Sequence, residues 1–140
     1  MRTPLPTFIL FVLGCLLFFF ALGNHQLQGS AEPRVAGIAM EMYLDNDWIV
    51  PKLNGQPFLE KPPLSLWLDS SAIKLFGGTP LAVRLASAFA GLFSLMLLYA
   101  MLRKLGRPAT IAWAAAILMA TTASYLSNSR QVGEDALLSL

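Results

Sequence analysis

The chain has 140 residues, of which 56% are hydrophobic and 13% charged, and its mean hydropathy is +0.59. Soluble domains usually have about a quarter of their residues charged, so a water-facing surface over most of this chain is excluded. A net charge of +2 with scattered basic residues argues against nucleic-acid binding, which needs a basic patch with interleaved aromatic residues. The apolar residues gather in long runs, and the composition therefore indicates an integral membrane protein.

The first apolar run, about residues 7–22, predicts a membrane span that contains the chain's one cysteine, Cys15. A single cysteine forms no internal disulfide, and a buried thiol is expected rather than a lipoprotein cleavage site, because five apolar residues follow it. The run is short, and residues 21–23 also suit a signal-peptidase site, so a cleaved signal remains the alternative. A retained anchor is favoured because the later spans need a partner helix.

A polar insertion of about residues 24–79 follows. Val35, Ile38, Ala39 and Met42 recur at helical spacing, which predicts an amphipathic helix that packs on neighbouring helices or lies in the lipid interface. The Asn-Gly pair at residues 54–55 and the surrounding prolines predict turns. A second interfacial helix is predicted over residues 64–76, since its charged residues, including Asp69, make it a poor span.

Two further spans are predicted at about residues 80–102 and 109–126. Thr79 suits the N-cap of the second span and Pro80 its first turn. The basic turn at 103–108 and Arg2 place the N-terminus in the cytoplasm by the positive-inside rule. The loop of residues 24–79 and the segment 127–135 then face the periplasm or exterior together. Two polar segments that are far apart in sequence thus reach one membrane face.

Charged side chains lie beside the predicted membrane helices on that face. Ionisable groups near hydrocarbon are costly unless they pair or serve a site. Carboxylates suit deprotonation of an acceptor hydroxyl, and cations suit a phosphate, so the set fits transfer of a group carried on a lipid phosphate. The alternative is that they are solvated loop residues or local salt bridges. The candidates are Glu32, Arg34, Glu60, Lys61, Arg130, Glu134 and Asp135.

Other chemistries lack their motifs. The one histidine, His25, lies just outside a span and is expected to be solvated. The sequence contains no glycine-rich phosphate loop, Walker sequence, zinc-ligand spacing or Ser/His/Asp set.

Four strings resemble the N-terminal part of the dolichyl-phosphate-mannose protein mannosyltransferase superfamily, and most closely its bacterial lipid A aminoarabinose transferase branch. They are AEPR at residues 31–34, AGIAMEM at 36–42, DWIVP at 47–51 and LNGQPFLEKPPL at 53–64. The likeness covers about residues 30–140. It implies an all-α membrane protein, the N-terminal part of a GT-C glycosyltransferase fold, with about three transmembrane helices and two juxtamembrane helices in a periplasmic loop.

The resemblance also implies roles for particular residues. Glu32 and Asp135 match acidic positions expected to be catalytic, while Arg34, Glu60 and Lys61 match positions associated with the carrier phosphate. Glu60 is also associated with a divalent metal. The implied partners are an undecaprenyl-phosphate-linked sugar as donor, a lipid A or protein acceptor and membrane lipids, at the bacterial inner membrane.

One departure from the family pattern concerns the catalytic carboxylate. Where many relatives have Asp before the Glu, this chain has Ala31, so either Glu32 substitutes or the role passes to Asp135. An acceptor that is already an anion, such as a lipid A phosphate, needs a general base less.

Two other classes of protein are alternatives. The length suits a non-catalytic small membrane protein acting in assembly or protein–protein contact, but the loop strings count against it. A transporter fragment lacks broken helices and charges at mid-membrane depth. The final residues open another apolar run, so we expect this sequence to be the N-terminal portion of a longer enzyme.

Overall fold

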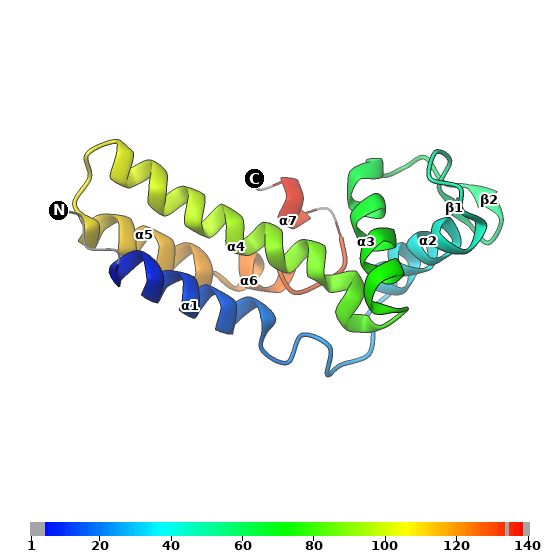
Figure 1. The fold of residues 1–140 in the computed structure, drawn as a ribbon, viewed down its shortest axis with the longest axis horizontal. Helices are drawn as coiled ribbons and strands as arrows, with labels where there is room; N and C mark the ends of the chain where they lie inside the picture. Colours follow the sequence, from blue (N-terminus) through cyan, green and yellow to red (C-terminus); the bar gives the residue numbers. More distant parts are fainter. Residues whose placement is uncertain (1–4, 134, 139–140) are drawn as a thin grey trace.

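The computed structural model describes residues 5–133 and 135–138. Within these ranges the regular secondary structure is almost entirely helical (Figure 1). The elements in chain order are α1 (Leu5–Phe19), α2 (Ala31–Asp45), β1 (Lys52–Leu53), β2 (Gln56–Pro57), α3 (Pro63–Phe76), α4 (Pro80–Lys104), α5 (Ala109–Thr121), α6 (Ala123–Asn128) and α7 (Asp135–Leu138).

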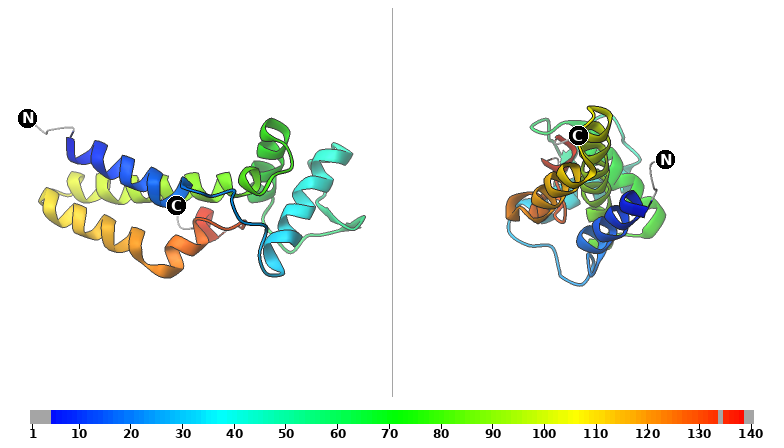
Figure 2. Two further views of the ribbon diagram at one scale, coloured as in Figure 1. Left: turned by 90° about the horizontal axis from the view of Figure 1, so that it is seen from below. Right: turned by 90° about the vertical axis from the view of Figure 1, so that its left-hand side faces the viewer.

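Helices α1, α4 and α5 lie side by side and form one elongated region of the molecule (Figures 1 and 2). The α5 face of this contact consists of Ala112, Ala116 and Ala120, all with 0% exposure, and such small residues let membrane helices approach closely. Helix α4 has 25 residues and is long and apolar enough to cross a bilayer, while α1 and α5 are shorter apolar helices. The protein is thus an all-α membrane protein, as the composition predicts.

Two helix boundaries differ from the predicted spans. The third predicted span, residues 109–126, is interrupted at Thr122, whose φ of −62° and ψ of 122° are extended. The Thr121 and Thr122 hydroxyls donate to the carbonyls of Ile117 and Leu118 at 2.8 and 2.7 Å, and such local bonds compete with helix continuation. The first helix ends at Phe19 rather than at residue 22, and a left-handed residue, Ala21 with φ 55°, follows it.

Beyond the N-terminal end of α4, helices α2 and α3 pack against each other (Figure 1). The predicted stripe on α2 is confirmed, because Val35, Ile38, Ala39 and Met42 are at most 3% exposed and form one cluster with Leu66 and Ile73 of α3. Of the two predicted environments, the structure therefore shows packing on a neighbouring helix. The predicted start of α4 is also confirmed, since the Thr79 hydroxyl accepts the Ala82 N–H at 3.2 Å.

The predicted Asn-Gly turn closes a short antiparallel hairpin, β1–β2, that the sequence analysis did not anticipate as strands. Asn54 and Gly55 have φ values of 53° and 76°, the positive values that a two-residue type I′ turn needs. The Glu41 carboxylate accepts both of their N–H groups, at 2.7 and 3.1 Å. The turn is thereby fixed to the exposed side of α2.

Candidate functional site

A cavity of about 410 Å³ lies where the start of α2 meets the segment that precedes α7. Its residues come from the start of α2, from the loop before α3, which supplies Lys61, and from the segment before α7. The two polar segments that the predicted topology puts on one membrane face thus meet here. Its lining is Gln28, Gly29, Ser30, Ala31, Glu32, Arg34, Val35, Lys61, Gln131, Val132, Gly133 and Asp135. Four of the five predicted site residues are therefore brought together, and the fifth, Glu60, is not in the lining.

Glu32 of α2, which lines this cavity, forms a buried ion pair with Arg84 of α4. The two side chains make a two-pronged contact, with Nε to Oε1 at 3.0 Å and Nη2 to Oε2 at 2.8 Å. Glu32 is 3% exposed and Arg84 5%. Backbone N–H groups of Gln28 and Val132 also donate to the carboxylate, at 2.7 and 2.8 Å.

These contacts set the charge state of Glu32. Burial alone would raise the pKa of Glu32, but the hydrogen bond from Arg84 opposes it, and the N–H groups of Gln28 and Val132 add to this opposition. The net result is a Glu32 pKa below its ordinary value, so the side chain is a carboxylate at neutral pH.

The remaining donors of Arg84 fix the connection between α1 and α2. Nη1 donates to the carbonyls of Leu22 and His25, both at 2.9 Å, and Nη2 donates to the carbonyl of Gln26 at 3.0 Å. A single guanidinium thus joins α4, α2 and the loop after α1. An arginine one turn inside an apolar span is costly unless it is paired, so the place of Arg84 in the sequence is the signal that could indicate this role.

Three charged residues of the cavity lining have access to solvent: Arg34, Lys61 and Asp135. Arg34 is exposed, and its guanidinium carbon lies 5.8 Å from the centre of the Phe58 ring, a cation–π geometry that holds the side chain in place. Lys61 is half-buried, and Asp135 is the exposed first residue of α7. Two cations and a carboxylate therefore face one solvent-accessible space.

The metal assignment of Glu60 stays a prediction. Glu60 is exposed. Over residues 5–133 and 135–138, no three side chains of His, Cys, Asp or Glu converge to hold an ion. The described residues do not fit a metal site, so no step below depends on one.

Arg130 and His25 line a second cavity of about 390 Å³, which shares Gln28, Glu32 and Gln131 with the first. Arg130 donates to the carbonyls of Leu17 and Phe20 at the end of α1. This places it outside the lining that contains Arg34 and Lys61. Arg2 and Glu134, also used in the sequence analysis, lie outside the described residues.

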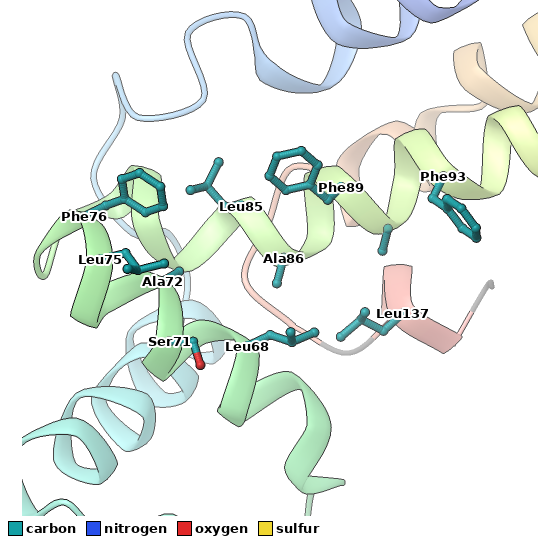
Figure 3. A pocket seen from close by; sticks show the side chains of 11 residues that line it. Leu68, Ser71, Ala72, Leu75, Phe76, Leu85, Ala86, Phe89, Phe93 and Leu137 are labelled. Carbon is teal, nitrogen blue, oxygen red and sulfur yellow. The ribbon is translucent and has the colours of Figure 1, made fainter.

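An apolar groove of about 490 Å³ runs between α3, α4 and α7 (Figure 3). Its walls include Leu75 and Phe76 of α3, Phe89 and Phe93 of α4, and Leu137 of α7. Ser71 supplies a hydroxyl, which donates to the Trp67 carbonyl at 2.7 Å. The groove is thus a hydrocarbon-like surface next to the membrane helix α4.

Asp69 is a buried carboxyl of α3 outside the cavity lining. It is 2% exposed, and its Oδ2 has no hydrogen-bond partner within the part of the chain that the structure describes. Burial raises the pKa of Asp69 to about 8. At neutral pH the group is therefore mostly the uncharged acid, which explains how α3 accommodates it.

The architecture matches part of the GT-C membrane fold that two solved structures share. A crystal structure of ArnT from Cupriavidus metallidurans in the apo state matches 94% of the chain with a TM-score of 0.78 and 26% identity. A second ArnT structure, bound to undecaprenyl phosphate, matches 98% with a TM-score of 0.85 and 24% identity. The family model of the dolichyl-phosphate-mannose-protein mannosyltransferases matches residues 34–140, and the chain belongs to this family.

Curated relatives carry the name undecaprenyl phosphate-alpha-4-amino-4-deoxy-L-arabinose arabinosyl transferase. The protein from Pseudomonas aeruginosa is 34% identical over 76% of this chain and 19% of its own length. The protein from Aeromonas salmonicida is 38% identical over 70% of this chain and 17% of its own length. The chain therefore spans about a fifth of the length of these relatives, and about a quarter of the ArnT chains.

Proposed function

We propose that this chain is part of a glycosyltransferase that moves a sugar from a polyprenyl-phosphate carrier of the undecaprenyl type to a lipid A or protein acceptor. The observation that supports this most is the cavity that gathers Arg34, Lys61 and Asp135 from three separate segments. The names of the curated relatives, which describe transfer of an arabinose derivative from undecaprenyl phosphate, support the same reaction class.

In this proposal Arg34 and Lys61 bind the phosphate of the carrier. An acceptor oxygen bonds to the anomeric carbon of the sugar while the bond from that carbon to the phosphate oxygen breaks. The electron pair of the broken bond leaves on the polyprenyl phosphate, where the two cations stabilise the growing charge. When the acceptor is a hydroxyl, its proton passes to a cavity carboxylate, Asp135 or Glu32. Asp135 has the more open position of the two.

The proposed location is the periplasmic face of the bacterial inner membrane, with a cytoplasmic N-terminus. The basic turn between α4 and α5 supports this orientation by the positive-inside rule. The α4 residues of the apolar groove extend only from Leu85 to Phe93, and Glu32 of the cavity pairs with Arg84, so both lie toward the opposite end of α4. A carrier whose phosphate enters the cavity has a hydrocarbon-like surface close by for its isoprenoid chain.

Replacement of Lys61 tests the proposal directly. In the intact protein, Lys61→Ala is expected to lower the rate of sugar transfer roughly 100-fold, the scale on which single charge-stabilising donors act. Lys74→Ala is the matched control, because Lys74 is an exposed lysine of α3 outside the cavity lining. Transfer to the acceptor is measured by mass analysis. Unchanged turnover in Lys61→Ala would remove this residue from the site.

A further inference from the structure

We infer that Glu32 is a positioning residue: together with Arg84 it holds the segment that leads into Asp135 against the start of α2, and Asp135 is the carboxylate that meets the acceptor. The part concerning the acceptor rests on the proposed transferase function. The part concerning position rests on the contacts of the described residues alone.

The Glu32 carboxylate has no acceptor capacity left for a substrate proton. A carboxylate offers about four lone-pair sites. Oε1 accepts from Arg84 Nε at 3.0 Å and from the Val132 N–H at 2.8 Å. Oε2 accepts from the Gln28 N–H at 2.7 Å and from Arg84 Nη2 at 2.8 Å. A general base needs a free lone pair within hydrogen-bond reach of the proton that it takes.

The same four bonds connect three parts of the chain. Gln28 precedes α2, Arg84 belongs to α4, and Val132 lies three residues before Asp135. A second anchor lies beside the Val132 bond, because the Ser87 hydroxyl of α4 donates to the Gly133 carbonyl at 3.1 Å. The backbone just before Asp135 is therefore held at two consecutive residues.

Glu32 also fixes the opposite side of the cavity, where Arg34 lies. Arg34 follows Glu32 by two positions on α2, so an anchored Glu32 also sets where Arg34 stands. Ala31, next to it in the lining, brings no acid. Among the described lining residues the carboxylates are Glu32 and Asp135, and Asp135 is the exposed one.

Glu32→Gln separates positioning from proton transfer, because it keeps the side-chain size and removes the charge. One carboxylate oxygen is replaced by an NH2 group, which faces the N–H donors of its neighbours. The four hydrogen bonds to the Glu32 carboxylate are thereby disturbed. We expect kcat to fall roughly 10- to 100-fold, the effect of an ångström-scale misplacement. In the unsubstituted enzyme, kcat should rise with pH as the general base loses its proton. Glu32→Gln should keep this limb of the pH profile, because the general base, Asp135, is still present. Asp135→Asn is expected to abolish that limb and to lower kcat further.

Amide hydrogen exchange provides a readout that needs no activity. The Val132 N–H is expected to exchange at least 10-fold faster in Glu32→Gln than in the unsubstituted intact protein. Glu41→Gln is the matched control, since Glu41 is also a carboxylate of α2 that accepts two backbone N–H groups, from Asn54 and Gly55. That control should leave Val132 exchange and kcat unchanged.

The outcomes separate the two proposals. Loss of the pH limb in Glu32→Gln, with Val132 exchange unchanged, would overturn the positioning role and make Glu32 the base. Unchanged kcat and unchanged exchange would overturn it as well. If the intact protein transfers no sugar at all, the proposed function fails, whereas faster Val132 exchange in Glu32→Gln still supports the structural role of Glu32.

Discussion

The region of α1, α4 and α5 and the region of α2 and α3 are held together by different forces. Between the three long helices the contacts are mainly apolar, such as the alanine face of α5 against α4. Between α2, α3 and their connections, directional bonds are added to the apolar core, for example the Ser70 hydroxyl donating to the Ala39 carbonyl at 2.7 Å. Non-directional packing tolerates small adjustments, while hydrogen bonds to buried charges do not.

The Glu32–Arg84 pair joins the two regions, because one partner belongs to α2 and the other to α4. Substitutions there should affect both regions at once. Substitutions on either side of the junction should have smaller or more local effects.

The largest effect is expected from Arg84→Met. The change leaves the Glu32 carboxylate buried without its cation and leaves three loop carbonyls without their donor. Breaking a buried ion pair by removing one partner typically destabilises by about 3–5 kcal/mol. The melting temperature of the intact protein in detergent measures this. Lys104→Met, an exposed charge at the other end of α4, is the control and should change little.

Asp69→Asn should act within the α2–α3 region and depend on pH. The folded-state pKa of Asp69, about 8, lies above its ordinary value of 3.8, so stability is full below pH 3.8 and declines as the pH rises to about 8. Asn cannot ionise, so above pH 8 the free energy of unfolding of the variant should exceed that of the unsubstituted protein by on the order of 2–4 kcal/mol. Thermal unfolding at pH 5 and pH 9 measures the difference. Equal pH dependence in both proteins would contradict a buried neutral acid.

Gly91→Ala probes the three-helix region. A Cβ at this position would lie 2.7 Å from the Cβ of Ser129 and 2.5 Å from its Oγ, so the segment after α6 must move away from α4. Overpacking of this kind typically costs about 1–3 kcal/mol. The same movement would strain the bond from the Tyr125 hydroxyl to the Gly91 carbonyl, now 2.8 Å. Melting temperature is the measurement, with Gly37→Ala as control because nothing lies within 4 Å of that position.

The smallest and most local effect is expected from Gly55→Ala. Gly55 has a φ of 76°, which a side chain disfavours by about 1 kcal/mol. Since the hairpin contacts α2 through Glu41, amide exchange should increase at residues 54–55 while the melting temperature barely changes. An equal loss of protection throughout α4 would show that the two regions are less independent than their contacts indicate.

Much of the fold follows from the sequence, because it is encoded by local patterns. The stripe from Val35 to Met42, the N-cap at Thr79 and the Asn-Gly turn each depend on residues within a few positions of one another. The break at Thr122 does not follow from the sequence, since threonine hydroxyls lie within many uninterrupted membrane helices as well. Composition cannot distinguish the two cases.

The candidate site was predictable in its membership more than in its roles. Charge type and family resemblance indicated Glu32, Arg34, Lys61 and Asp135, which line one cavity. That Glu32 is saturated by Arg84 and Val132 could not be foreseen, because these partners are 52 and 100 positions away in the sequence. The exposed position of Glu60 outside the lining likewise depends on how the loop folds.

The interruption at Thr122 also shapes the surrounding lipid. At about 1.5 Å per residue, α5 is about 20 Å long, whereas an unbroken helix through Asn128 would measure about 30 Å and match an average hydrocarbon core. Hydrophobic mismatch of this size is relieved by local thinning of the bilayer around a short helix. Headgroups beside α5 would then lie deeper than those beside α4, whose 25 residues exceed that thickness.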